Sequence, residues 1–242
     1  MCDFEIQYAL IIPAFNEAGS LKEIFSKLQE IVVLRKDLEI ILIDNGSTDA
    51  TSHLFTIFRS ANEEPRLKLL TKQSNTGYGA GLKYGFSNSS APYLIWTHAD
   101  LQCDLWDVIR AITKHEVEGC GPFDIVKGMR WRRSILDRTI SFLLGTINRL
   151  VNFIAIDDIN AQPNLVSRIT LQKIRDLPDD STFELNFLTK ALRSGHRIFR
   201  FPVLFLDRKH GTGSNDGFNR KFAFSVTCIK SILNLRKNRA DY

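Results

Sequence analysis

Short apolar runs alternate with amphipathic segments through the first half of the chain. Between the runs, apolar residues recur at helical spacing, as in Leu21, Phe25 and Leu28. Strands that are apolar throughout and separated by such helices indicate an α/β fold, with a mostly parallel sheet covered on both faces. The runs that predict strands are Tyr8–Ile12, Glu39–Ile43, Leu67–Thr71, Pro92–Thr97 and Asp124–Lys127.

After Gly128 the pattern changes to longer helical segments with fewer strands. A long apolar helix is predicted over Ser134–Ile156, a second helix over Phe183–Arg193, and a terminal helix over Phe218–Arg239. Leu165–Val166 and Ile198–Leu206 predict the remaining strands. No internal repeat or linker interrupts the sequence, so we expect one domain over residues 1–242.

The composition is that of an ordinary globular protein and excludes collagen-like or disordered chains. The 242 residues are 44% hydrophobic and 24% charged, with a formal net charge of +5. This charge suits acidic partners such as phosphorylated substrates, an anionic membrane surface or nucleic acid. Four scattered cysteines predict a reducing compartment.

The sequence predicts neither a signal peptide nor a membrane-spanning segment. Acidic residues stand at the N-terminus where a signal peptide needs Lys or Arg. No apolar run reaches the roughly 18 residues that would span a bilayer. We therefore expect a cytoplasmic protein, either free or peripheral at the cytoplasmic face of a membrane.

Polar clusters directly follow four of the predicted strands. They are Asn16-Glu17, Asp44-Asn45, the segment Asn75–Gly81, and the segment His98–Gln102. In parallel sheets, ligands gather outside the carboxyl ends of the strands. The four clusters therefore predict a single site at one edge of the sheet.

Each cluster also has a local structural interpretation. The carboxylate and amide groups after the first two strands can bond ribose hydroxyls and a base edge, or they form turns. His98, Asp100 and Gln102 can project the same way and ligate a divalent ion with a diphosphate, or Asp100 caps the next helix. The glycines of Asn75–Gly81 do not match GxGxxG, which argues against a Rossmann dehydrogenase.

Taken together and in order, these motifs resemble the family 2 glycosyltransferases of GT-A fold. The series is PAFNE, DNGSTD, NTGYGAG and HADLQ, followed by Lys127–Trp131 and by Phe201–Arg208. The likeness is greatest to the branch of dolichyl- or polyprenyl-phosphate mannose and glucose synthases. It implies a three-layer fold in which residues 7–128 bind the nucleotide sugar, 129–215 the acceptor, and 216–242 form a C-terminal helix.

The resemblance also implies roles for individual residues. Arg130 and Arg208 would hold the phosphates of donor and acceptor, and Mg²⁺ or Mn²⁺ would bind Asp100 and Gln102. The residues implied in binding the nucleotide sugar are Pro13, Ala14, Phe15, Asn16, Glu17, Ile43, Asp44, Asn45, His98, Ala99 and Asp100. Those implied in binding the acceptor phosphate are Lys127, Arg130, Arg208 and Lys209.

Three positions depart from the pattern of the family. Asn45 stands where the family commonly has a second Asp, which affects the preference for the base. His98 replaces the first Asp of the usual Asp-x-Asp, so the ion site has one negative charge fewer and a weaker or altered metal dependence is expected. Asn215 stands in place of a lysine, which removes one phosphate contact.

The predicted reaction is inverting transfer of a hexose from a GDP- or UDP-linked donor to a polyprenyl or dolichyl phosphate. Two alternatives stay open. A saccharide hydroxyl acceptor, as in surface-polysaccharide synthesis, would need a base, for which Asp157 or Asp158 is the candidate unless both are turn residues. The second alternative is a non-catalytic protein that binds nucleotide sugar.

The segment Arg130–Ile156 bears on the acceptor and on partners. Its cations flank apolar residues such as Phe142, Leu150 and Phe153, which suits a helix at a membrane interface. Basic residues of the terminal helix would add attraction to anionic lipid. A core-packing or dimer-forming helix pair is the alternative, and a membrane-protein partner is left open. Nucleic acid is not expected, because no binding motif for it occurs.

Overall fold

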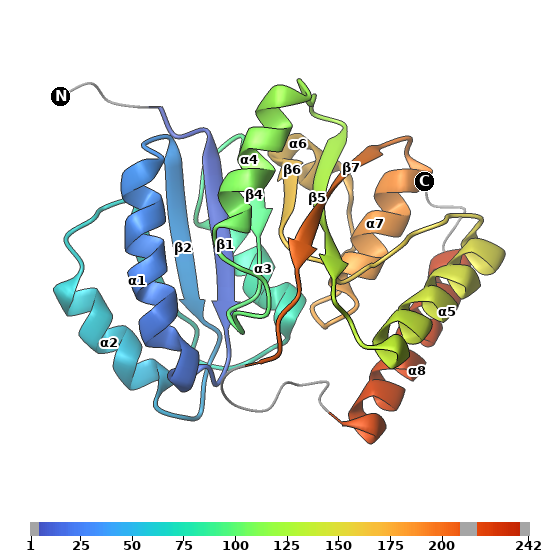
Figure 1. The fold of residues 1–242 in the computed structure, drawn as a ribbon, viewed down its shortest axis with the longest axis horizontal. Helices are drawn as coiled ribbons and strands as arrows, with labels where there is room; N and C mark the ends of the chain where they lie inside the picture. Colours follow the sequence, from blue (N-terminus) through green and yellow to red (C-terminus); the bar gives the residue numbers. More distant parts are fainter. Residues whose placement is uncertain (1–4, 209–216, 238–242) are drawn as a thin grey trace.

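The central feature of the protein is a seven-stranded sheet with helices on both faces (Figure 1). The computed structural model describes residues 5–208 and 217–237. The strands are β1 (Tyr8–Ala14), β2 (Leu38–Asp44), β3 (Leu67–Thr71), β4 (Tyr93–Trp96), β5 (Asp124–Trp131), β6 (Asn164–Ser167) and β7 (Arg197–Leu204). Their order is β3-β2-β1-β4-β6-β5-β7. Only the short β6 runs antiparallel to its neighbours, so the predicted mostly parallel α/β sheet is confirmed.

Two hydrophobic clusters join the helices to the sheet, one on each face. Helices α1 (Ala18–Leu34), α2 (Thr51–Ala61) and α4 (Asp107–Val117) pack on one face. The other face carries α3 (Tyr78–Ser87), α5 (Ile135–Asn152), α6 (Arg168–Lys173), α7 (Phe183–Arg193) and α8 (Phe218–Lys237). The arrangement gives three layers. The six-residue α6 is the one helix here that the hydrophobic pattern did not predict.

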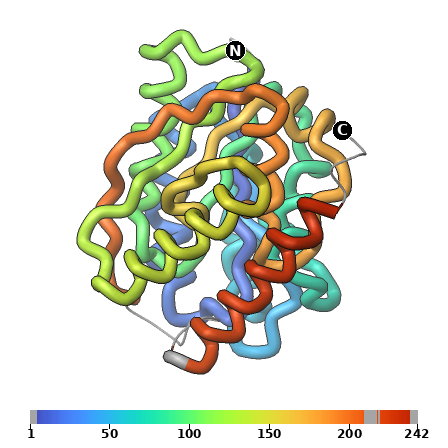
Figure 2. The backbone as a smooth tube through the Cα atoms, turned by 90° about the vertical axis from the view of Figure 1, so that its right-hand side faces the viewer, coloured from blue at the N-terminus to red at the C-terminus, as the bar shows by residue number. Residues whose placement is uncertain are grey.

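Helices α5 and α8 lie side by side at one end of the molecule (Figure 2). The amide of Asn152 donates to the carbonyl oxygen of Ile232 at 3.0 Å and ties the two helices together. Among residues 5–208 and 217–237, no helix combines the length and the apolar character needed to cross a membrane.

Strand β1 continues past Pro13, where the sequence predicted its end. Ala14 still receives a hydrogen bond from the Asn45 backbone N–H at 2.8 Å, on the side of β2. Hydrogen bonds alternate between the two sides of a strand, so Pro13 faces the side of β4. The pairing of β1 with β4 stops at Ile11 and Trp96. The missing N–H of Pro13 therefore leaves no ladder bond unmade.

Helix α3 approaches the sheet closely through glycine. A Cβ added to Gly85 would lie 2.3 Å from Cγ2 of Ile11 and 2.9 Å from Cδ1 of Ile43. Gly77, which precedes the helix with φ +114°, would place a Cβ 2.2 Å from the carbonyl oxygen of Asp179. Gly77 and Gly85 therefore permit α3 to pack closely against the sheet and against the segment before α7.

We expect Gly85→Ala to lower the free energy of unfolding by about 1–3 kcal/mol, because the added methyl group overpacks the contact between α3 and β1. That figure is the net change, after the gain of about 1 kcal/mol in helix propensity that Ala brings over Gly. Urea unfolding measures the change. Gly121→Ala is the matched control: its Cβ would meet nothing nearer than 3.8 Å, and the change should stay below about 1 kcal/mol. Equal stabilities of the two variants would contradict the packing argument.

Candidate active site

The carboxyl ends of β1, β2 and β4 open into one pocket of about 830 Å³. Its lining includes most of the residues implied in donor and ion binding. These are Pro13, Ala14, Phe15, Asn16, Glu17, Asn45, His98, Ala99, Asp100 and Gln102, and Arg130 and Arg208 join them. The four polar clusters predicted to share one edge of the sheet therefore do so.

Hydrogen bonds between the first two loops fix the rim of the pocket. The side-chain oxygen of Asn16 accepts from the Thr48 backbone N–H at 2.8 Å, and the Asn16 backbone N–H donates to Ser47 Oγ at 3.0 Å. The Glu17 backbone N–H donates to Thr51 Oγ1 at 2.9 Å. The loops after β1 and β2 therefore act as one unit.

Glu17 and Arg208 form an ion pair across the pocket. Arg208 lies beyond the end of β7, far from Glu17 in sequence, so the contact brings the two halves of the chain together. Burial raises the pKa of the Glu17 carboxyl, while the hydrogen bond from Arg208 opposes this rise and nearby Asp100 adds to it. A ligand that offered Arg208 a phosphate would compete with Glu17 for the guanidinium.

Asn45 lines the pocket and carries an unsatisfied acceptor. Its amide nitrogen donates to the Gly77 carbonyl oxygen at 3.0 Å, but its buried side-chain oxygen has no partner among the described residues. A buried acceptor without a donor is costly, so a ligand N–H or hydroxyl would satisfy it. The predicted position of Asn45 near a base or ribose fits this geometry.

Ile43 and Asp44 do not line the pocket, although the resemblance implied a role for both in donor binding. Ile43 is fully buried in the core beside Gly85. Asp44 is also fully buried, where it accepts from the Ser47 backbone N–H at 2.9 Å and from Ser52 Oγ at 2.5 Å. Asp44 is therefore a turn residue, as the structural interpretation of this cluster predicted, because its hydrogen bonds hold the loop that contains Asn45.

The loop after β4 offers a limited set of ligands for a cation. Asp100 accepts the Gln102 backbone N–H at 3.1 Å through one oxygen, and the Gln102 amide nitrogen donates to the Leu206 carbonyl oxygen at 3.3 Å. The second Asp100 oxygen and the Gln102 amide oxygen take no part in these two bonds, and both residues line the pocket. Within residues 5–208 and 217–237, no cluster of three or more His, Cys, Asp or Glu could hold a metal. The oxygens of Asp100 and Gln102 are of the kind that Mg²⁺ or Mn²⁺ takes, and such an ion usually completes its shell with water and substrate phosphates.

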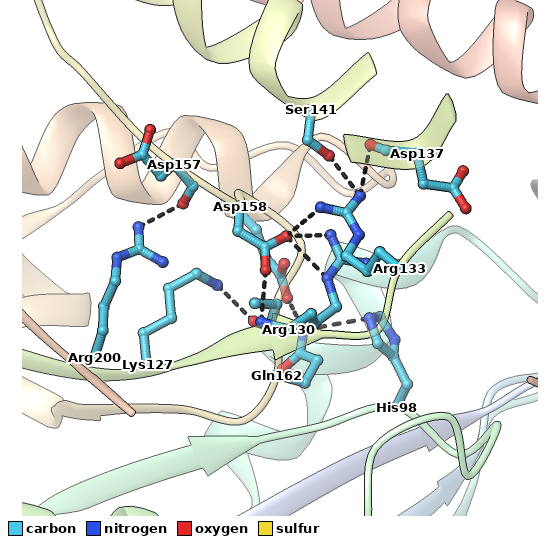
Figure 3. A network of polar contacts seen from close by, with 12 residues as sticks. His98, Lys127, Arg130, Arg133, Asp137, Ser141, Asp157, Asp158, Gln162 and Arg200 are labelled. Carbon is cyan, nitrogen blue, oxygen red and sulfur yellow. Dashed lines mark hydrogen bonds and ion pairs between the residues drawn. The ribbon is translucent and has the colours of Figure 1, made fainter. Parts of the chain in front are cut away.

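Arg130, near the end of β5, and Arg133, just after it, surround a single aspartate. Asp158 accepts from the Arg130 backbone N–H at 2.8 Å, from Arg130 Nε at 2.9 Å and from Arg133 at 3.1 Å (Figure 3). Burial alone would raise the pKa of Asp158, but the hydrogen bonds from Arg130 outweigh it and lower that pKa. The buried Nε of Arg133 has no partner among the described residues, and Arg133 itself lines the pocket.

Three described residues implied in catalysis or phosphate binding lie away from the pocket lining: Asp157, Asp158 and Lys127. Asp157 is exposed, and Figure 3 shows its carboxylate turned away from Arg130 and Arg133. Lys127 is fully buried and donates to the Ala161 carbonyl oxygen at 2.5 Å and to Asn164 Oδ1 at 2.7 Å. It lies beneath the pocket because its side chain points to the same face of β5 as that of Ile125. Lys209 lies outside the described residues.

The pocket also contains residues that the sequence analysis did not single out. Glu184, at the start of α7, accepts from Trp96 Nε1 at 3.0 Å and from the Tyr78 hydroxyl at 3.2 Å. Burial, and then the Glu184 charge, raise the pKa of Tyr78 well above its usual value. The further lining residues of this kind include Asp180, Gln162, Arg133, Arg220 and Lys221. No pattern in the sequence singled out Glu184, because the helical stretch Phe183–Leu188 also contains a second polar residue, Asn186.

Known proteins with similar structures share the fold of this chain. A mannosyltransferase from Pyrobaculum calidifontis, solved with GDP-Man and Mn²⁺, superposes with a TM-score of 0.63 at 19% identity over 97% of this chain and 70% of its own. A glucosyl-3-phosphoglycerate synthase from Mycobacterium tuberculosis, in complex with phosphoglyceric acid, gives 0.71 at 14% identity over 95% and 79%. These likenesses confirm the predicted GT-A fold.

Sequence relatives include two bacterial proteins named undecaprenyl-phosphate 4-deoxy-4-formamido-L-arabinose transferase. The one from Pseudomonas fluorescens is 28% identical over 206 residues, which are 84% of this chain and 58% of the relative. The one from Klebsiella pneumoniae is 26% identical over 84% of this chain and 61% of the relative. The chain thus spans about three fifths of the length of these relatives.

The chain also matches a protein family as a whole. Residues 9–166 match the family described as glycosyl transferase family 2. The matched region includes the loops after β1, β2 and β4 as well as Arg130 and Arg133. The family and enzyme class that the motifs predicted are confirmed: the chain belongs to glycosyl transferase family 2.

Proposed function

We propose that the protein transfers a hexose, with inversion, from a GDP- or UDP-linked donor to a polyprenyl or dolichyl phosphate. The observation that carries the proposal is that Arg130 and Arg208 reach the same pocket as Glu17, Asn45 and Asp100. The names of the two curated relatives support a polyprenyl phosphate acceptor. Solved neighbours that contain GDP-Man or UDP support a nucleotide-sugar donor.

The donor would lie across the loops after β1, β2 and β4. The unsatisfied oxygen of Asn45 and the loop around Phe15 suit the base and ribose, and Asp100 with Gln102 would hold Mg²⁺ or Mn²⁺ against the diphosphate. When bound, the ion would neutralise charge on the leaving diphosphate. Arg208 would turn from Glu17 to the phosphates, since its fork of donors matches their oxygens.

The acceptor phosphate would enter near Arg130 and Arg133. Its oxygen attacks the anomeric carbon as the bond from that carbon to the diphosphate oxygen breaks, and the nucleoside diphosphate leaves with the electron pair. A phosphate is already ionised, so the attack requires no general base. The guanidinium groups of Arg130 and Arg133, both of which line the pocket, would orient it.

A saccharide hydroxyl acceptor would need a base, and neither candidate suits that role. Asp158 is held as an ionised partner of two arginines, which lowers its pKa and its basicity. Asp157 is exposed, and neither residue lines the pocket. The geometry therefore favours the phosphate acceptor over the hydroxyl acceptor.

Helix α5 supports a site of action at the cytoplasmic face of a membrane. At helical spacing, one face of α5 carries exposed apolar side chains, while its opposite face packs against α8 and the core. The exposed residues are Ile135, Leu136, Phe142, Leu143, Leu150 and Phe153. Arg132, Arg138 and Arg149, which are also exposed, flank this face. We infer that the face docks on anionic lipid, where residues 137–144 of the same helix wall the pocket.

The first test is transfer of labelled sugar from GDP- and UDP-linked donors to a short polyprenyl phosphate with Mg²⁺ or Mn²⁺. We expect turnover with the lipid phosphate and none with a saccharide acceptor, and Arg208→Gln should lower kcat/KM by at least about a hundredfold. Arg59→Gln, on the outer surface of α2, is the control and should be neutral. Donor binding without transfer under any condition would favour the non-catalytic alternative instead.

Asp158→Asn and Asp157→Asn form a matched pair. Asp158→Asn leaves two partly buried arginines unneutralised, so it should lower the free energy of unfolding by about 3 kcal/mol at pH 7, whereas Asp157→Asn should change it by less than about 0.5 kcal/mol. The lowered folded pKa means that the contribution of Asp158 is complete above about pH 4 and is lost as the pH falls through that lower value. Urea unfolding at pH 7 and pH 3 should show the gap between the two variants closing in acid.

The same pair tests the acceptor. Asp157→Asn should retain wild-type transfer to lipid phosphate, because no base is required there. Abolition of turnover by Asp157→Asn, with stability unchanged, would point to a hydroxyl acceptor.

Docking on lipid is tested by sedimentation with vesicles that contain about one third anionic lipid. Burial of a Phe or Leu side chain is worth about 1.5–3 kcal/mol, so Phe142→Ser with Leu150→Ser should weaken binding at least tenfold. The control pair is Val33→Ser with Val117→Ser, which are equally exposed but lie on α1 and at the end of α4. The inference would be overturned if the wild-type protein did not sediment with vesicles and light scattering showed that it dimerises through α5.

A further inference from the structure

A chain of buried polar side chains runs beneath the pocket and ends at His98. Its members come from four segments: Lys127 on β5, Asn164 on β6, Gln162 in the loop before β6, and Glu184 on α7. None of these four is more than 2% exposed. Figure 3 shows Lys127 and Gln162 in this network, with His98 beside Gln162 at its end.

The ammonium of Lys127 sets the direction of the first hydrogen bonds. An ammonium can only donate, so the Asn164 oxygen that lies 2.7 Å from it must be the acceptor. The other atom of that amide, Nδ2, then donates to Gln162 Oε1 at 2.9 Å. Burial lowers the pKa of Lys127 to about 8, and even the neutral amine would keep two hydrogens for its two acceptors, Asn164 and the Ala161 carbonyl oxygen.

The carboxylate of Glu184 fixes the same direction from the other end. Gln162 uses its oxygen to accept from Asn164, so its nitrogen is the donor, and this nitrogen donates to Glu184 Oε1. The same carboxylate oxygen accepts from the indole N–H of Trp96, which can only donate. Both ends of the chain therefore require the Gln162 nitrogen to be a donor.

His98 Nε2 lies 3.2 Å from that donor nitrogen. It must accept, and the proton of the imidazole must then be on Nδ1. Nδ1 has no hydrogen-bond partner among the described residues, and His98 lines the pocket beside the Tyr78 ring, with ring centroids 5.1 Å apart. The ring is thus fixed with one N–H available.

We propose that Gln162, oriented by Lys127 and Glu184, is a positioning residue that holds His98 as the Nδ1–H tautomer, and that this N–H donates to an oxygen of the bound nucleotide sugar. The oxygen belongs to the diphosphate or to the hexose. The proposal deepens the proposed function and rests on its donor site. It assigns a purpose to the departure from Asp-x-Asp, because a neutral hydrogen-bond donor stands where a second carboxylate would repel the diphosphate.

The tautomer is measured on the full chain labelled with ¹⁵N, through two-bond ¹H–¹⁵N correlations of the imidazole rings. His196 is an internal standard, because its Nδ1 lies 2.8 Å from the Ala191 carbonyl oxygen and must also carry the proton. His98, identified by the signals lost in His98→Asn, should show the same pattern as His196. In Gln162→Met the Nε2–H form should become populated for His98 alone. An Nε2–H ring in the wild type would overturn the proposal, and this readout needs neither donor nor activity.

Calorimetric binding identifies the oxygen that His98 contacts. Loss of one hydrogen bond in His98→Phe should weaken binding about three- to tenfold, and His98→Asn, which keeps an N–H near the position of Nδ1, should restore most of it. Equal weakening for the nucleoside diphosphate and the nucleotide sugar indicates the diphosphate, and weakening for the nucleotide sugar alone indicates the hexose. Unchanged affinity for both ligands would overturn the donor role of His98. No binding of any nucleotide by the wild type would instead defeat the proposed function.

Discussion

The parallel pairing of β1 with β2 and β4 is the constraint on which the site depends. Parallel neighbours end at the same edge, so the loops that carry Glu17, Asn45 and Asp100 must meet there. The second half of the chain completes the pocket because β5 and β7 are parallel as well, which places Arg130 and Arg208 at the same edge. The antiparallel β6 connects the two groups of strands between β4 and β5.

Beneath this edge, the protein maintains a set of buried charges. Trp96, Asn164 and Lys127 are paired in register across β4, β6 and β5, so their side chains form one row that faces α7. The negative charge of Glu184 on α7 is linked to the positive charge of Lys127 by hydrogen bonds through the two amides between them. A buried charge without such partners would cost far more free energy than this linked pair. The row gives the pocket a rigid floor, and its donors and acceptors are oriented before any ligand binds.

The sequence predicted the sheet and the rim of the site because both depend on local patterns. Apolar runs indicated the strands, and polar residues after them indicated the loops. The interior could not be predicted in the same way, because the pairing of β5 with β6 and the packing of α7 are not local. Lys127 therefore suggested a phosphate ligand although it is buried, and Glu184 within α7 gave no sign that it lies in the floor. Asp158 likewise suggested a base, while its contacts make it the partner of two arginines.

If the protein acts as proposed, the polar loops and the arginines from the second half of the chain bind one diphosphate together. A crystal structure of the protein soaked with UDP or GDP and Mn²⁺ would test this. We expect the diphosphate between Asp100 and Arg208, with the cation on Asp100 and the ion pair of Arg208 with Glu17 opened. Nucleotide bound elsewhere on the molecule, or an intact ion pair beside bound diphosphate, would contradict it.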